Sequence, residues 1–121
     1  MSDGLFYVLL PRFNMFSLTN LMEPARIANY LSVEDVYHKK YLSFDGPDIT
    51  ASNGMAVKCE MAPEQIRRND LIFIVGSWGA EHYANRKLFS WLRLQARNGV
   101  RICAVEICLL YTSPSPRDRF L

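Results

Sequence analysis

The stretch Leu71-Ile-Phe-Ile-Val75 decides the fold class of this chain. Five consecutive apolar residues, bounded by Asp70 and Gly76, are typical of a strand that is covered on both faces in a parallel sheet. Two further apolar runs, Leu5 to Leu10 and Arg101 to Val105, have the same character, and helical patterns separate the three runs. Strands that alternate with helices predict an α/β fold with a mainly parallel sheet.

Two amphipathic helices are predicted between these strands. The first follows Pro11, which ends the first strand because proline cannot donate a hydrogen bond to a central ladder. Ser17 is its predicted N-cap, and Pro24 predicts either a kink or a late helix start near Met22. The second helix is predicted from about His82 to Asn98, with Asn98-Gly99 as its C-terminal cap. The stripe that this helix buries consists of Leu88, Trp91, Leu92 and Gln95.

Shorter elements are predicted in the middle of the chain. They are a strand from about Tyr37 to Ser43, turns at Asp45-Gly46-Pro47 and Ser52-Asn53-Gly54, a strand from Ala56 to Cys59 and one helical turn over Pro63 to Ile66. Asparagine and glycine favour turns because both tolerate the left-handed region of backbone space.

The composition is that of an ordinary globular domain. A chain of 121 residues suits a single domain, and 50% hydrophobic with 21% charged residues argues against disorder. The formal net charge of +2 is small, so the composition does not predict a basic surface for nucleic acid.

Cysteine usage and the N-terminus indicate the compartment. Three cysteines, Cys59, Cys103 and Cys108, show no metal-binding spacing, so we expect a reduced protein without disulfide, metal or cofactor. No apolar run reaches the roughly 18 residues that cross a bilayer. The first residues, Met-Ser-Asp-Gly, lack the basic segment of a signal peptide. A cytoplasmic location without membrane association is therefore expected.

Two segments of the first half carry a family resemblance. Glu23-Pro24-Ala-Arg-Ile-Ala-Asn29 and the turn Ala51-Ser-Asn-Gly54 resemble the DJ-1/PfpI-like domain, also called class I glutamine amidotransferase-like, at the N-terminus of GlxA-like regulators of the AraC family. The resemblance runs from about Phe6 to Glu106. It implies a flavodoxin-like, three-layer sandwich that is incomplete over residues 1–107. Residues 108–121, which contain Ser113-Pro-Ser-Pro116, are expected to be non-native or disordered, with a polyproline II linker as the alternative.

The resemblance also bears on catalysis. Enzymes of this superfamily place a nucleophilic cysteine on the sharp turn after the strand matched by Arg101 to Val105, where helix N-terminal amides stabilise its thiolate. Glu106 occupies that position here, and Cys108 occupies a position that is glycine in relatives. Asn20 stands where the enzymes carry an acid on the first helix. We therefore expect no catalytic residues, with an enzyme of the superfamily, a hydrolase or an isonitrile hydratase-like protein, as the alternative.

A small-molecule site is predicted where the strands end. In open α/β sheets, ligands bind outside the carboxyl ends of the strands at the point where the strand order reverses. Arg12, the loop Gly76-Ser77-Trp78 and Glu106 follow three such ends, and Arg12 or Glu106 would favour an anionic or a cationic metabolite respectively. Asn20 is a further candidate ligand contact. An equal alternative is that Gly76 and Gly79 only turn the chain.

The function implied by the resemblance is effector sensing and dimerisation within a transcription regulator. The effectors of some relatives are nitrogenous metabolites such as betaine- or carnitine-like compounds. DNA binding would belong to a C-terminal helix-turn-helix domain, because this chain shows no basic recognition helix. A flavodoxin-like phosphate or cofactor binder lacks support, since no glycine-rich loop follows the first strand.

Overall fold

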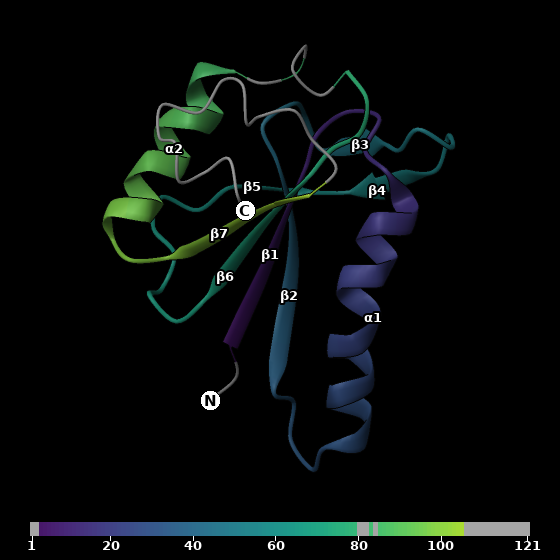
Figure 1. Ribbon diagram of the computed structural model, residues 1–121, viewed down its shortest axis with the longest axis vertical. Coiled ribbons are helices and arrows are strands. Elements are labelled where there is room, and N and C mark those ends of the chain that lie inside the picture. The colour runs from purple at the N-terminus through teal and green to yellow at the C-terminus, as the bar shows by residue number, and fades with distance from the viewer. Residues whose placement is uncertain (1–2, 80–82, 84, 106–121) are drawn as a thin grey trace.

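The computed structural model describes residues 3–79, 83 and 85–105 and forms a five-stranded sheet with a helix on each face (Figure 1). The sheet order is β5-β2-β1-β6-β7, and every neighbouring pair is parallel. Its strands are β1 (Asp3–Leu9), β2 (Tyr37–Ser43), β5 (Glu60–Met61), β6 (Leu71–Val75) and β7 (Arg101–Val105). The predicted α/β class with a mainly parallel sheet is confirmed.

The central strands are the apolar runs that the sequence singles out. Tyr7, Leu9, Ile72 and Val75 are completely buried, because β1 and β6 lie inside the sheet with a core on each side. The chain passes from β1 to β2 on one side and then crosses to β6 on the other. The strand order therefore reverses between β1 and β6, which makes their carboxyl ends the switch point of the sheet.

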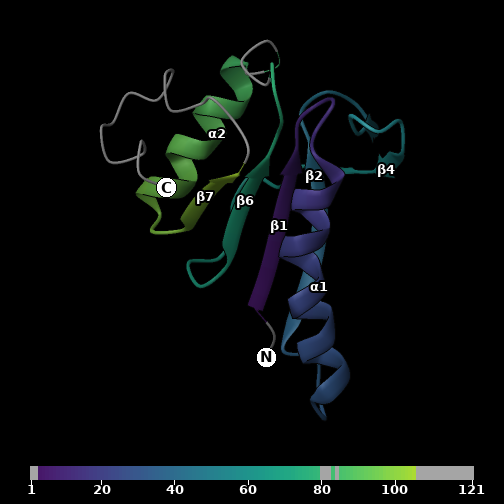
Figure 2. The same ribbon diagram turned by 45° about the vertical axis from the view of Figure 1, so that its right-hand side comes forward.

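The two helices lie on opposite faces of the sheet (Figure 2). Helix α1 (Met15–Leu31) packs on the face that carries Leu5, Tyr7 and Leu9. Helix α2 (Arg86–Arg97) packs on the face that carries Phe6, Val8 and Ile72. Alternate residues of β1 thus supply two separate cores, as the period of a strand requires.

Helix α1 differs from its prediction at the N-terminus. It begins at Met15, and Asn14 is its N-cap, with the Asn14 side chain accepting the backbone N–H of Ser17 at 3.1 Å. The predicted N-cap at Ser17 and the alternative start near Met22 are both wrong. The helix continues through Pro24, whose missing N–H removes a single hydrogen bond that the rest of the helix outweighs.

Residues 63–66 do not form the predicted helical turn. Side chains of α2 bind their backbone instead. The Trp91 indole donates to the Pro63 carbonyl at 2.7 Å, and the Gln95 amide accepts from Ile66 N–H and donates to the Glu64 carbonyl, both at 3.0 Å. A backbone whose polar groups are satisfied across the core has no need of local helical bonds.

The other predicted elements agree closely with the structure. The strands Tyr37–Ser43 and Arg101–Val105 have the predicted bounds, and the predicted strand after the second turn is β4 (Ala56–Lys58), which pairs in antiparallel fashion with β3 (Asp48–Thr50). Helix α2 starts at Arg86 after the N-cap Asn85, later than predicted, and ends at Arg97, with Asn98-Gly99 as its C-terminal cap as expected. His82 and the whole of 106–121 lie outside the described residues.

One region of the sheet is open on the side of α1. This helix lies over β1 and β2, so the residues of β6 and β7 on the same face, Leu71, Phe73 and Cys103, are only partly buried (Figure 1). Within the described residues no helix is long and apolar enough to span a bilayer.

Candidate functional site

The loops after β1 and β6 form a single hydrogen-bonded unit at the switch point. Leu10 donates its backbone N–H to the Val75 carbonyl at 3.0 Å, and Asn14 donates its own to the Gly76 carbonyl at 3.0 Å. Gly76 in turn donates to the Val105 carbonyl at 3.2 Å. The carboxyl ends of three neighbouring strands are therefore held together. The sequence predicts this arrangement, because its apolar runs indicate parallel strands, which end at the same edge of the sheet.

The β3–β4 hairpin completes this region. Thr50 accepts the backbone N–H of Arg12 at 2.8 Å, and Ser52 donates to the Phe13 carbonyl at 2.9 Å. Phe13 is fully buried in the α1-side core and anchors the loop between β1 and α1. The hairpin cannot be placed at the site from sequence, because a pairing between segments some forty residues apart leaves no local signal. The turn Ala51-Ser-Asn-Gly54 is the local sequence signal that indicates this hairpin.

Arg12 has a strained backbone at the centre of this unit. Its φ is 64°, in the left-handed region that side chains other than glycine rarely adopt, and its guanidinium group is exposed. Such a conformation costs about 1–2 kcal/mol relative to a right-handed one. Strain of this kind persists where the surroundings enforce it and is frequent at ligand sites. The strained backbone of Arg12 thus lies beside the switch point, and its side chain is exposed there.

We expect Arg12→Gly to raise the free energy of unfolding by about 0.5–1 kcal/mol. Relief of the left-handed strain, ~1–2 kcal/mol, exceeds the ~0.4–1 kcal/mol that the greater freedom of glycine adds to the unfolded state. Urea unfolding followed by circular dichroism measures the change. Arg12→Ala removes the same charge but keeps the Cβ atom, so a stabilisation equal to that of Arg12→Gly would contradict the assignment of strain.

Trp78 is the other prominent side chain beside the switch point. It follows Gly76 and half-buried Ser77 directly after β6, and 93% of its surface is exposed. An exposed indole contributes nothing to the core, unlike Trp91, which is 9% exposed. Gly79 has a φ of 81°, in the left-handed region that glycine adopts without strain. Arg12, Gly76, Ser77 and Trp78 are thus the predicted site residues that the structure places at neighbouring strand ends.

The two remaining candidates stand apart. Asn20 is exposed and lies four residues after Phe16 and seven before Ile27, both exposed, so it shares the outer face of α1 with them. The face of α1 that packs on the sheet is a different one, and we leave Asn20 out of the site. Glu106 lies outside the described residues, and its role as a ligand contact stays a prediction.

Among the cysteines, Cys59 is unsuited to nucleophilic chemistry. It is 8% exposed, and burial, helped by the nearby Asp48 carboxylate, raises the pKa of its thiol to about 11. A thiol with that pKa stays protonated at neutral pH and lacks the nucleophilic thiolate form. In the part of the chain described by the structure, no group of three or more His, Cys, Asp or Glu side chains is arranged to bind a metal ion.

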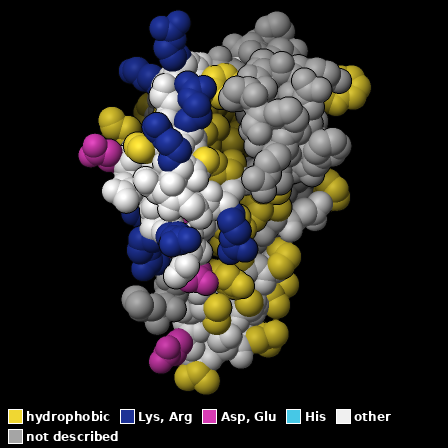
Figure 3. Space-filling view, turned by 60° about the vertical axis from the view of Figure 1, so that its left-hand side comes forward, with side chains coloured by type: hydrophobic (Ala, Val, Ile, Leu, Met, Phe, Trp, Pro, Cys, Tyr) yellow, Lys and Arg dark blue, Asp and Glu magenta, His cyan; other side chains and the backbone are white. Residues whose placement is uncertain are grey.

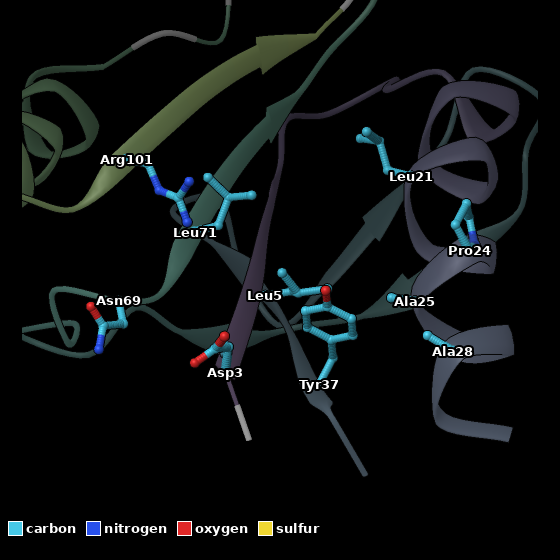
Figure 4. Close-up of a pocket in the computed structure, with 11 residues that line it drawn as sticks. Asp3, Leu5, Leu21, Pro24, Ala25, Ala28, Tyr37, Asn69, Leu71 and Arg101 are labelled. Carbon is cyan, nitrogen blue, oxygen red and sulfur yellow. The ribbon is translucent and has the colours of Figure 1, made fainter. Parts of the chain in front are cut away.

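A cavity of about 380 Å³ lies at the opposite, amino end of the strands (Figure 4). Leu21, Pro24, Ala25 and Ala28 of α1 line one side, and Leu71 and Arg101 line the other. Its apolar lining residues continue the α1-side core, where β6 and β7 are only partly covered, and Asp3, Asn69 and Arg101 add polar groups to the lining. We therefore interpret it as part of the open core and keep the candidate site at the switch point.

Comparison with known proteins adds the family context. No family model matches the chain. It is 35% identical over 106 residues to the HTH-type transcriptional regulator CdhR of Pseudomonas aeruginosa. The aligned region covers 88% of this chain and 31% of CdhR. It is 32% identical over 99 residues to the HTH-type transcriptional regulator GbdR of the same species, covering 82% of this chain and 27% of that one. Homologues of this chain are transcription regulators.

Solved structures agree on the fold. An AraC family transcriptional regulator from Pseudomonas putida matches with a TM-score of 0.74 at 22% identity, over 84% of this chain and 55% of that one. A DJ-1 superfamily protein from Agrobacterium tumefaciens matches with a TM-score of 0.65 at 16% identity, over 84% and 52% of the two chains. The fold of the chain is DJ-1-like, as the resemblance implied. The DJ-1-like chain spans roughly 30% of the length of the curated regulators that it matches.

Proposed function

We propose that this chain is the effector-sensing and dimerising part of an AraC-type transcription regulator, and that it does not catalyse a reaction. The observation that carries the proposal is the hydrogen-bonded unit at the switch point, where a strained Arg12 and an exposed Trp78 border the ends of β1 and β6. Similarity to HTH-type regulators supports it. In the complete cytoplasmic protein, a separate helix-turn-helix domain binds DNA.

The chemistry of the site favours a small zwitterion with a quaternary ammonium group and a carboxylate. The Arg12 guanidinium provides forked N–H donors for a carboxylate. The Trp78 indole attracts a quaternary ammonium group through its π face, an interaction of about 0.5–2 kcal/mol. Betaine- and carnitine-like metabolites carry both groups. A ligand of this kind shifts the protein between its DNA-competent and incompetent states only by its difference in affinity for the two.

Ligand-dependent thermal shifts of the complete protein test this proposal. We expect glycine betaine or carnitine, at millimolar concentration, to raise the melting temperature of the wild type, and Trp78→Ala to abolish most of that rise. Because Trp78 is 93% exposed, its loss leaves the unliganded melting temperature unchanged within a degree or two.

The matched control is Met61→Ala, another exposed apolar side chain, on β5 at the edge of the sheet. It should retain the full ligand shift. Equal ligand shifts in the wild type and in both Trp78→Ala and Arg12→Gln would show that the binding site lies elsewhere.

The dimerising surface that we propose is the outer face of α1. This helix is apolar on both sides: beyond its buried face, it exposes Phe16 (74%), Ile27 (47%) and Leu31 (77%). Tyr30 beside them is 83% exposed. An apolar second face is typical of a helix that is covered in the assembled protein.

The order of residues along α1 favours a second copy of the same chain. Phe16 and Leu31 lie at equal distances from the point between Glu23 and Pro24, as do Asn20 and Ile27. Two α1 helices related by a two-fold axis at that point are antiparallel, and Phe16 of one then meets Leu31 of the other. A two-fold interface requires a surface that complements itself in this way.

A further inference from the structure

The positive charge of this chain is concentrated on and around α2. Residues 62–70 and 85–101 contain seven of the 14 Lys and Arg residues but only two of the 12 Asp and Glu residues. The side chain of Arg68 lies against Gly99 just after the helix, and Arg101 begins β7. Figure 3 shows Lys and Arg side chains gathered along one strip of the face that it displays, with few acidic side chains among them. The net charge of the whole chain is small because acidic residues elsewhere in the chain balance this cluster of basic residues.

The cations of α2 form one exposed face. Arg86, Arg93 and Arg97 are spaced at seven and four residues, so they project from one side of the helix, with exposed Lys87 beside them. The opposite side is anchored by the buried side chains of Leu88, Trp91 and Gln95, of which Leu88 and Trp91 belong to the α2-side core. The outer face is thus fixed in orientation and turned to solvent.

This arrangement violates the local rules for a stable helix. Arg86 and Lys87 stand in the first turn, where the helix dipole favours acidic residues, and that turn contains none. Arg93 and Arg97 are like charges at four-residue spacing, which costs about 0.2–0.5 kcal/mol. Among the described residues, no carboxylate forms an ion pair with any cation of α2. Residues that depart from these helix preferences without a stabilising partner are expected at functional surfaces.

We propose that the outer face of α2 contacts the phosphate backbone of duplex DNA. The face extends about 16 Å from Arg86 to Arg97, at 1.5 Å per residue, which is enough to meet several phosphates of one strand. It exposes no large apolar residue: among the described residues these lie on other segments, such as α1 and the loop of Trp78. Arginine also anchors protein interfaces, but together with aromatic side chains, which this face lacks. A membrane would need an apolar face to insert, so polyanionic DNA is the partner that this surface fits best.

The inference builds on the proposed regulator function, in which DNA lies close to the sensing domain. In addition, the sensing domain itself contributes to the affinity of the complete protein for DNA. Phosphate contacts carry no sequence information, so α2 strengthens binding to every duplex alike and leaves the choice of site to the helix-turn-helix domain.

Salt-dependent DNA binding by the complete protein tests the inference, with a 30-base-pair duplex of arbitrary sequence as the probe. We expect Arg93→Gln/Arg97→Gln to reduce the magnitude of the slope of log K against log salt by about 0.9 for each lost contact. Affinity at 0.1 M salt should fall by roughly one to two orders of magnitude. Circular dichroism should show an unchanged fold, because both side chains are exposed.

The control is Lys39→Gln/Lys58→Gln, which removes the same charge from exposed positions on β2 and β4. It should leave the slope unchanged. The inference is wrong if the α2 variant keeps the wild-type slope, or if the control lowers the slope as much. A wild-type protein that binds no duplex at all would overturn the proposed regulator function instead, and with it this extension.

Discussion

Replacing Trp91 with alanine is expected to lower the free energy of unfolding by about 3–5 kcal/mol, the usual cost of removing a large aromatic side chain from a core. Trp91 packs in the α2-side core, with its ring 5.5 Å from that of Phe44. Its indole N–H also binds the Pro63 carbonyl at 2.7 Å and so fixes the connection that leads into β6. The loss therefore removes packing and leaves a carbonyl group without its partner.

Urea unfolding, followed by far-ultraviolet circular dichroism, measures this effect. The chain supplies its own control in Trp78→Ala, which removes the same side chain from a 93% exposed position and should change stability by less than about 0.5 kcal/mol. Trp91→Phe keeps an aromatic ring but not the N–H donor, and should fall between the two. Similar losses for Trp78→Ala and Trp91→Ala would contradict the assignment of Trp91 to the core.

Disruption of the α1 face is expected to weaken dimerisation of the complete protein by roughly 1,000-fold or more. In Ile27→Glu/Leu31→Lys, each protomer loses two aliphatic anchors worth about 1.5–3 kcal/mol apiece, and a two-fold interface counts each loss twice. Glutamate and lysine at this four-residue spacing favour the helix, so α1 itself should remain folded. Sedimentation equilibrium measures the dissociation constant.

A matched pair on the other helix serves as the control. Arg86→Glu/Ser90→Lys introduces the same two side chains at the same spacing on the exposed face of α2. That variant should remain a dimer. If the α1 variant keeps the wild-type dissociation constant, the outer face of α1 is not the dimer interface.

The candidate site illustrates how far local sequence carries such a prediction. Arg12, Gly76 and Trp78 were identified because each follows an apolar strand, and parallel strands bring their carboxyl ends to one edge. No local pattern indicates the left-handed backbone of Arg12, because it results from the hydrogen bond that Arg12 donates to the Thr50 carbonyl and from the burial of Phe13 beside it. Asn20 was named from its position relative to Pro24, but only the packing of α1 reveals that it lies on the outer face.

The errors in the predicted secondary structure have the same origin. Ser17 was a reasonable N-cap by residue type, yet Asn14 occupies that place because the Gly76 carbonyl fixes its backbone at the switch point. Residues 63–66 have a helical pattern, but the side chains of Gln95 and Trp91 form hydrogen bonds with their backbone groups across the core. In both cases a contact that is distant in sequence outweighed a local preference.

The pattern of residues along the chain is enough to predict the parallel α/β fold, because strands buried on both faces are continuous apolar runs, which can be recognised without knowing their partners. It also carried the resemblance to DJ-1-like regulators. The folded chain is needed to see that the apolar stripe on α1 and the basic face of α2 point outward, and that the backbone of Arg12 is strained. Burial and backbone strain depend on neighbours that are distant in the sequence. Neither local sequence patterns nor the overall composition of the chain contains this information.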